Sequence, residues 1–310
     1  MRIAKWILAI TVSIVMAVSG FIYLAPESAF HLLVNAMRAH AGLDRKSIQL
    51  PDGLRYVYLD GGQGAPLMLL HGFGANKDCF IRIVGLLTKH YRVIIPDHIG
   101  FGESSHPVDA DYSPPAQALR LRSFTRALGV TDLHIGGNSM GGHIAMTYAA
   151  LFPGEVKSLW LLDPGGVWSA PKSVLRTTFE ATGKNPLFIK SEEDYETLLR
   201  WVMSEPPFVP RPILSVLARE RIENNHLEER ILREITADSV EPRVTGLMTP
   251  ALIVWGEKDF IIHPETAKIL NRMMPHSRVV LMPKTGHLPM FENPRKSARD
   301  YLAFRALLAQ

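Results

Sequence analysis

Cysteine and single-sign charge runs are both scarce in this chain. There is a single cysteine, Cys79, so neither an internal disulfide nor a cysteine-rich zinc site can form. The 34 Lys and Arg residues nearly balance the 30 Asp and Glu residues, for a formal net charge of +4. The basic residues are spread along the chain with no aromatic-basic stripe, which argues against a nucleic-acid partner. Fixed-period repeats and low-complexity tracts are also missing.

Apolar sequence, in contrast, is abundant and regularly spaced. Of the 310 residues, 47% are hydrophobic, which suits one large domain or a domain with an insertion. After Asp44, short apolar runs alternate with helix-like segments, and this alternation predicts a mostly parallel sheet with helices on both faces. The expected strands are 55–60, 66–72, 91–97, 132–136, 156–162, 251–256 and 277–283, and the expected helices are 78–89, 115–128, 140–151, 264–273 and 294–308.

The N-terminal segment has a different character. Residues 6–25 carry no charge and follow Arg2 and Lys5, and they are long enough to span a bilayer, which takes roughly 20 residues. We expect an uncleaved signal anchor. A cleaved signal peptide is the first alternative, because Ala17, Val18 and Ser19 before Gly20 form a passable cleavage site. A helix buried in the domain is the second.

The segment that follows the anchor reads as an amphipathic helix. Residues 27–43 place apolar side chains at helical spacing, so this helix is expected on the membrane surface or on the domain. Arg2 and Lys5 favour a cytoplasmic N-terminus, although Arg38, Arg45 and Lys46 follow the anchor. We therefore expect the folded domain outside the cytoplasm, which is the periplasm if the source is bacterial.

The strand–helix alternation stops between Gly165 and about Val244. This stretch is helical and interrupted by prolines, as expected for a cap inserted over the carboxyl ends of the strands, where open α/β sheets bind ligands. The predicted division of the chain is an anchor at 1–25, a juxtamembrane segment at 26–46, a first core part at 47–165, a cap at 166–243 and a second core part at 244–310.

A serine stands among glycines where an expected strand meets an expected helix. The sequence GNSMG at 137–141 matches the G-x-S-x-G nucleophile elbow, whose sharp turn requires neighbours without side chains. A helix-capping serine in a tight turn is the alternative. As a nucleophile, Ser139 would need a base, an acid and an oxyanion hole.

His287 is the expected base, because it follows the strand at 277–283 in a loop opened by Gly286. In this architecture the acid lies between serine and histidine in the chain. Asp259 follows the strand at 251–256, whereas Asp163, after the preceding strand, is its rival. Packing or surface roles are expected for the remaining candidates, namely Glu257, His71, His98, His134, His143 and His263.

The oxyanion hole requires two backbone N–H groups. Met140 is expected at a helix N-terminus, where N–H groups point outward. Phe73, in the HGFG loop after the strand at 66–72, would supply the second donor, with glycines on both sides allowing close approach to a substrate.

Five motifs together resemble the α/β-hydrolase superfamily: HGFG at 71–74, PDHIGFGES at 96–104, GNSMGG at 137–142, WGEKD at 255–259 and GHLPMFENP at 286–294. With the anchor and the cap, the chain more narrowly resembles bacterial lipases and the α/β-hydrolase-domain monoacylglycerol lipases. The resemblance implies the α/β-hydrolase fold and hydrolysis of acylglycerols through an acyl-enzyme on Ser139, with Asp259 and His287 completing the triad. It implies no metal or organic cofactor. The expected partners are a small acyl ester or glyceride and the lipid bilayer.

Two other functions stay open. Carbon–carbon bond hydrolases of ring-cleavage products resemble this chain at GNSMGG, but their dianionic substrates would call for arginines in the pocket. Arg211 and Arg219 lie in the expected cap, where charged side chains are usually solvated. The second possibility is a non-catalytic receptor or scaffold with a hydrolase fold.

Overall fold

The computed structural model describes residues 2–308. Its strands are β1 (Leu43–Gln49), β2 (Arg55–Gly61), β3 (Ala65–Leu70), β4 (Tyr91–Pro96), β5 (Leu133–Asn138), β6 (Val156–Leu162), β7 (Ala251–Gly256) and β8 (Ser277–Met282). Its helices are α1 (Arg2–Leu24), α2 (Pro26–His40), η1 (Lys77–Phe80), α3 (Ile81–Leu87), α4 (Pro114–Ala127), α5 (Met140–Leu151), α6 (Val174–Thr182), α7 (Glu192–Val202), α8 (Arg211–Glu223), α9 (Asn225–Ala237), α10 (Glu241–Val244), α11 (Thr266–Met273), α12 (Pro289–Glu292) and α13 (Pro294–Leu308).

Within the described residues the strands form one eight-stranded sheet in the order β1-β2-β4-β3-β5-β6-β7-β8. β1 pairs with β2, and β2 with β4, in antiparallel fashion, whereas every pair from β4 to β8 is parallel. The predicted mostly parallel sheet is confirmed. The carboxyl ends of β3, β5, β6, β7 and β8 therefore meet at one edge, where the candidate site lies.

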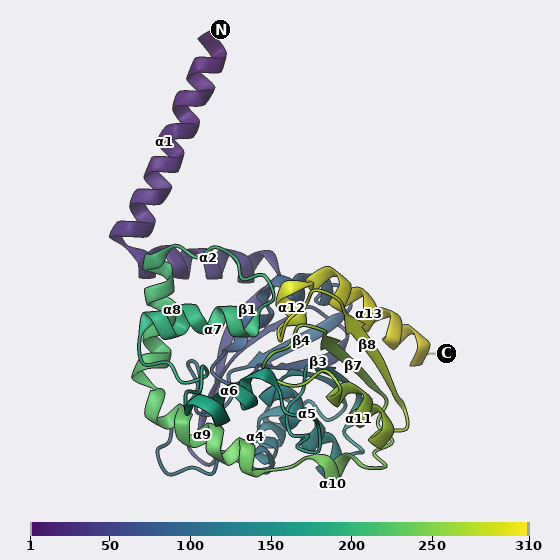
Figure 1. Cartoon of the computed structure of the whole chain (residues 1–310). Helices are drawn as coiled ribbons and strands as arrows, with labels where there is room; N and C mark the ends of the chain where they lie inside the picture. Colours follow the sequence, from purple (N-terminus) through teal and green to yellow (C-terminus); the bar gives the residue numbers. More distant parts are fainter. Residues whose placement is uncertain (1, 309–310) are drawn as a thin grey trace.

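Alternating side chains of each central strand enter two separate cores. In β3, Met68 and Leu70 join the cluster under α4, α5 and α11, whereas Leu67 and Leu69 join the cluster under α3 and α13 (Figure 1). Successive side chains of a strand point to opposite faces, so a strand covered on both sides reads as a continuous apolar run. This is why the short apolar segments were recognisable in the sequence.

The polar edge strand β1 was not predicted. It begins at Leu43, inside the segment 26–46 assigned to the juxtamembrane region, and only Leu43 of the strand is buried. Its sequence LDRKSIQ lacks the alternation that marks a strand. The backbone ladder with β2 fixes its conformation instead, so α2 ends at His40 and the sheet begins earlier than expected.

The N-terminal helix projects from the domain. Residues Ile3–Leu24 have a mean hydropathy of 2.4, none of that segment is buried, and α1 stands away from the rest of the molecule (Figure 1). The alternative of a helix packed inside the domain is therefore wrong. α2 lies across the foot of α1 and packs against α8, one of the helices inserted between β6 and β7 (Figure 1).

Candidate active site

Ser139 occupies a strained turn between β5 and α5. Its φ of 52° and ψ of −116° fall in a region that non-glycine residues rarely adopt. A Cβ on Gly137 would lie 2.3 Å from the carbonyl oxygen of Gly141, and a Cβ on Gly141 would lie 2.1 Å from that of Leu70. The glycines are therefore required by crowding, and Ser139 stays partly exposed beyond the strand end.

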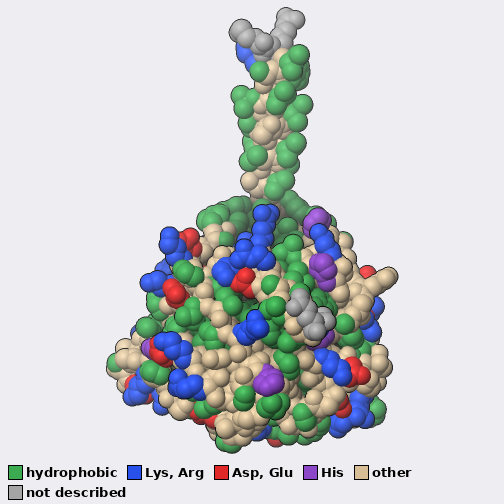
Figure 2. Space-filling model, turned by 90° about the vertical axis from the view of Figure 1, so that its right-hand side faces the viewer, with side chains coloured by type: hydrophobic (Ala, Val, Ile, Leu, Met, Phe, Trp, Pro, Cys, Tyr) green, Lys and Arg blue, Asp and Glu red, His purple; other side chains and the backbone are tan. Residues whose placement is uncertain are grey.

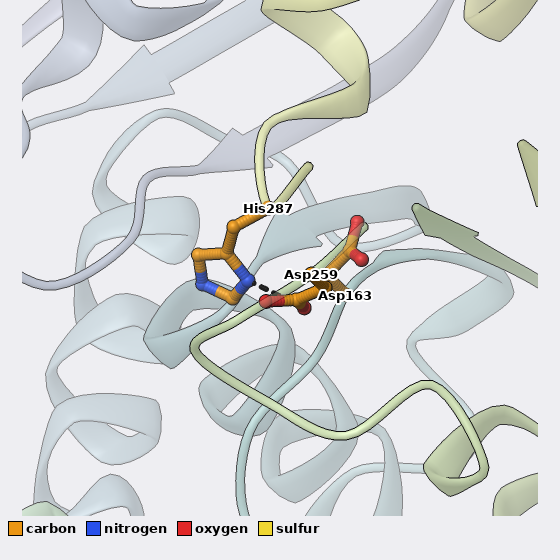
Figure 3. Close-up of side chains that lie close together, drawn as sticks. All are labelled: Asp163, Asp259 and His287. Atoms are coloured by element: carbon orange, nitrogen blue, oxygen red, sulfur yellow. Dashed lines mark hydrogen bonds and ion pairs between the residues drawn. The ribbon is translucent and has the colours of Figure 1, made fainter. Parts of the chain in front are cut away.

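His287 and Asp259 form a buried pair beside this turn. His287 Nδ1 lies 2.8 Å from Asp259 Oδ2, and both residues are 4% exposed (Figure 3). The other carboxylate oxygen, Oδ1, accepts the N–H groups of Ile261 at 2.8 Å and Ile262 at 3.0 Å. A carboxylate that accepts from Nδ1–H leaves Nε2 of a neutral imidazole as a proton acceptor, which is the state a general base needs.

Asn138 ties the histidine loop to the serine turn. Its Nδ2 donates to the carbonyl oxygens of His287 at 2.9 Å and Leu162 at 3.0 Å. Since Asn138 directly precedes Ser139, this bond holds the loop of His287 against the turn. The sequence alone indicates no role for Asn138, because its partner lies 149 positions away.

Glu292 supports the other side of the histidine loop. Its carboxylate accepts the N–H groups of Gly286 at 3.0 Å and Ser204 at 2.8 Å. The N–H of His287 itself donates to the carbonyl oxygen of Val202, the last residue of α7, at 2.8 Å. The inserted helices therefore contact the loop of the candidate base directly. No sequence pattern indicates this role of Glu292, because its bonds to Gly286 and Ser204 exist only in the folded chain.

Asp163 lies at the end of β6, close to the His287–Asp259 pair. One ligand atom of each of the three residues lies within 4.8 Å of those of the other two (Figure 3). Asp163 Oδ1 accepts the N–H of Gly256 at 2.9 Å, and burial, followed by the charge of Asp259, raises the pKa of Asp163 well above its usual value. His287 bonds to Asp259, not to Asp163.

The same three side chains are the cluster of described residues with a spacing that could hold a metal ion. A metal would need the Nδ1 lone pair or a free carboxylate oxygen. Nδ1 of His287, both oxygens of Asp259 and Oδ1 of Asp163 already have hydrogen-bond partners. Oδ2 of Asp163 is then the one carboxylate oxygen of the cluster without a partner among residues 2–308, and a single oxygen does not make a metal site. The arrangement suits proton transfer rather than metal ligation.

The HGFG loop lies against the serine turn. A Cβ on Gly72 would lie 3.3 Å from Ser139 Cβ. His71 fixes this loop: its Nε2 accepts the N–H of His98 at 3.0 Å, so the proton is on Nδ1, which donates to the carbonyl oxygen of Gly72 at 2.8 Å. Burial lowers the pKa of His71, which keeps the ring neutral in this role. Phe73 follows directly, and Met140 begins α5, where a first-turn N–H has no intrahelical acceptor.

A buried ion pair of the inserted helices covers the HGFG loop. The guanidinium carbon of Arg221 lies 5.5 Å from the ring centre of Phe73, and it fills the space next to Gly74. Arg221 Nε donates to both carboxylate oxygens of Glu228 at 2.8 Å. By contrast, the Arg211 and Arg219 side chains are 80% and 54% exposed, as expected for solvated residues.

Two of the other candidate histidines, His143 and His134, pair with side chains outside the site. His143 Nε2 lies 2.7 Å from an oxygen of Asp238, and His134 Nδ1 lies 2.9 Å from the hydroxyl of Ser158.

Similarity to known proteins extends over most of the chain. Residues 65–294 match the family model described as alpha/beta hydrolase fold. The chain is 45% identical over 284 residues to Lipase 1 of Psychrobacter immobilis, covering 89% of this chain and 88% of that one. It is 30% identical over 257 residues to the rat monoacylglycerol lipase ABHD6, covering 78% and 76%. The crystal structure of a membrane phospholipase A described as a bacterial virulence factor superposes with a TM-score of 0.89 at 35% identity, covering 100% of both chains.

Proposed function

The chain belongs to the α/β-hydrolase family and is a serine hydrolase of carboxylic esters, and from this premise we propose that it is a membrane-associated lipase of monoacylglycerols or medium-chain acyl esters. In this proposal Ser139 is the nucleophile, His287 the general base and Asp259 the acid that orients it. The backbone N–H groups of Phe73 and Met140 form the oxyanion hole. No metal or organic cofactor takes part.

The observation that carries the proposal is the buried His287–Asp259 pair, held beside the strained Ser139 turn by Asn138. In the first step Ser139 Oγ bonds to the ester carbonyl carbon while its proton passes to His287 Nε2. The tetrahedral intermediate collapses, and the alcohol leaves with that proton. Water then adds to the acyl-enzyme by the same route in reverse, which releases the fatty acid and returns the proton to Ser139. Asp259 stabilises the imidazolium that forms in each half.

Apolar side chains next to Asp259, one of them from the inserted helices, support the proposal of an acyl substrate. Phe260 directly follows Asp259, and the ring of Trp201 meets it edge-on with 6.4 Å between centroids. The N–H of Leu175, in α6, donates to the carbonyl oxygen of Phe260 at 2.9 Å. Each methylene that such a surface removes from water contributes about 0.8 kcal/mol, or about fourfold in affinity. We expect kcat/KM to rise from acetyl towards medium-chain esters.

The projecting α1 supports attachment to a bilayer. Hydrophobic side chains run along it and continue onto the domain at its foot (Figure 2). Leu32 and Leu33 of α2 are 64% and 58% exposed, and Phe208 is 91% exposed. A hollow of about 550 Å³ at the foot of α1 is lined by Tyr23, Phe208 and neighbouring side chains of the inserted helices. In our proposal α1 is an uncleaved anchor and the catalytic domain lies outside the cytoplasm, in the periplasm if the source is bacterial.

Deletion of residues 1–25 separates anchoring from catalysis. We expect the shortened chain to leave the membrane fraction. It should still hydrolyse a soluble butyrate ester at nearly the full rate, because the main contacts of α1 are with α2 and α8. Retention in the membrane fraction would argue against the anchor. Loss of soluble-ester hydrolysis in a shortened chain that still folds would mean that α1 contributes to catalysis, contrary to this expectation.

A substrate panel tests the activity itself. Purified full-length chain in detergent is offered esters of increasing acyl length, a monoacylglycerol, a triacylglycerol and a ring-fission diketone. We expect turnover of the esters, and faster turnover of the monoacylglycerol than of the bulkier triacylglycerol, which a covered site admits poorly. Cleavage of the diketone with no turnover of any ester would replace the lipase proposal by the carbon–carbon hydrolase alternative.

A further inference from the structure

The candidate site holds one more buried carboxyl group than a serine–histidine–acid triad needs. Asp163 is 0% exposed, and its carboxyl lies within 4.8 Å of an oxygen of Asp259 and a ring nitrogen of His287. Two carboxylates that share a buried site cannot both be ionised without a large cost, so one holds a proton.

The hydrogen-bond donors around the two groups decide which one holds it. Asp259 accepts three N–H groups: one from the ring of His287 and two from the backbone at residues 261 and 262. Asp163 accepts one, from Gly256, and among residues 2–308 its buried Oδ2 faces no donor. An oxygen without a donor is costly in a carboxylate and well suited to a hydroxyl.

We propose that Asp163 is a neutral carboxylic acid whose Oδ2 hydroxyl donates a hydrogen bond to the carboxylate of Asp259, so that Asp163 is a positioning residue for the acid–base pair. This role rests on the proposed function of Asp259 and His287. The backbone N–H of Gly256 holds one oxygen of Asp163, which turns the other towards Asp259. The site then carries a single negative charge, directed at His287.

The surroundings favour the neutral form. Burial raises the pKa of Asp163 well above its usual value, and the negative charges of Asp259 and Glu292 raise it further. The charged or titratable groups facing Asp163 are Asp259, Glu292 and His287. Asp163 also has a φ of 45°, a backbone region that Asp and Asn tolerate better than most residues.

Asp163→Asn is the discriminating variant, because an amide keeps the shape, the acceptor for Gly256 and a donor for Asp259. We expect its kcat on a soluble butyrate ester to stay within about threefold of wild type. The midpoint of the acidic limb of the pH–rate profile should move by less than about 0.3 unit. An ionised Asp163 would instead stabilise the imidazolium, and its removal would shift that limb to lower pH by about one unit or more.

Asp163→Ala removes the donor altogether. We expect kcat to fall about tenfold with KM nearly unchanged. The higher kcat of Asp163→Asn would then show that an amide donor at this position restores the activity. Thermal unfolding of each variant checks folding; if the Ala variant is unfolded, the pH profile of the Asn variant decides alone. A shift of that profile to lower pH, or wild-type kcat in a folded Ala variant, overturns the proposal.

Asp259→Asn is the control that separates this proposal from the proposed function. Large loss in Asp259→Asn with retention in Asp163→Asn supports both. Equal large losses in the two variants leave the catalytic pair standing and overturn the positioning role of Asp163. Full activity in Asp259→Asn overturns the proposed triad, and the role of Asp163 with it.

Discussion

Replacing Arg221 by methionine tests whether the buried ion pair of the inserted helices holds the HGFG loop. The Arg221 and Glu228 side chains are 7% and 5% exposed, and Arg221 also donates to the carbonyl oxygen of Leu187 at 2.8 Å. Methionine keeps much of the apolar stem but leaves Glu228 buried without its partner. Removing one member of a buried pair costs about 3–5 kcal/mol of unfolding free energy.

The loss in Arg221→Met should depend on pH. Burial raises the pKa of Glu228, whereas the charge of Arg221 lowers it. Without Arg221 the pKa of Glu228 therefore rises further. A carboxyl whose pKa is higher in the folded than in the unfolded protein binds more protons when folded, so stability falls as pH rises between the two values. The variant should therefore be closer to wild type at pH 5 than at pH 8. Changing both residues, Arg221→Met with Glu228→Leu, should recover most of the loss.

Activity should fall as well, because Arg221 packs on the ring of Phe73. Loss of one oxyanion donor costs about 10²–10³ in kcat, which sets the upper limit for a loosened loop. Urea unfolding and kcat on a soluble butyrate ester measure the two effects. Arg219→Met, on the same helix, is the control: its ion pair with Glu27 is exposed and is worth about 0–1 kcal/mol. Equal unfolding free energies for the two variants would refute the reasoning.

Two further predictions concern local conformation and acid stability. Gly74→Ala should lower stability and kcat more than Gly53→Ala in urea unfolding and ester assays. Both glycines have positive φ, but a Cβ at Gly74 would lie 2.1 Å from the Arg221 guanidinium carbon, whereas a Cβ at Gly53 would have no atom within 4 Å. Equal effects would exclude that contact as the cause. Burial raises the pKa of Glu103, but hydrogen bonds from two basic side chains outweigh it and lower the pKa from the usual 4.5 to about 2. The stabilisation that ionised Glu103 contributes is therefore present above pH 4.5 and lost as pH falls through about 2. Between pH 5 and pH 2 the urea midpoint of unfolding should fall more steeply in wild type than in Glu103→Gln.

The sequence predicted the parallel part of the sheet because buried strands are marked by continuous apolar runs. It also singled out the residues that follow strand ends, since the carboxyl ends of parallel strands meet at one edge. Asp259 and His287 were recognised in this way, and the structure brings them to 2.8 Å. Their catalytic role stays a prediction.

Contacts between segments far apart in the chain could not be predicted from the sequence. Asn138 bonds to His287 across 149 positions, and the edge strand β1 is held by its ladder with β2 rather than by an apolar pattern. Arg221 is buried although Arg219, two positions earlier, is solvated. Which face of α8 turns inward depends on the packing of the inserted helices over the HGFG loop, and one chain sequence cannot supply that information.

The central claim is that Ser139 forms the acyl-enzyme, and covalent labelling tests it most directly. The full-length protein and its Ser139→Ala variant are treated with a fluorophosphonate, the modified peptide is mapped by mass spectrometry, and monoacylglycerol hydrolysis is measured in parallel. We predict one adduct on Ser139, no adduct in the folded variant, and a loss of kcat of at least about a thousandfold. An adduct on another residue, or hydrolysis that survives in Ser139→Ala, would contradict the account.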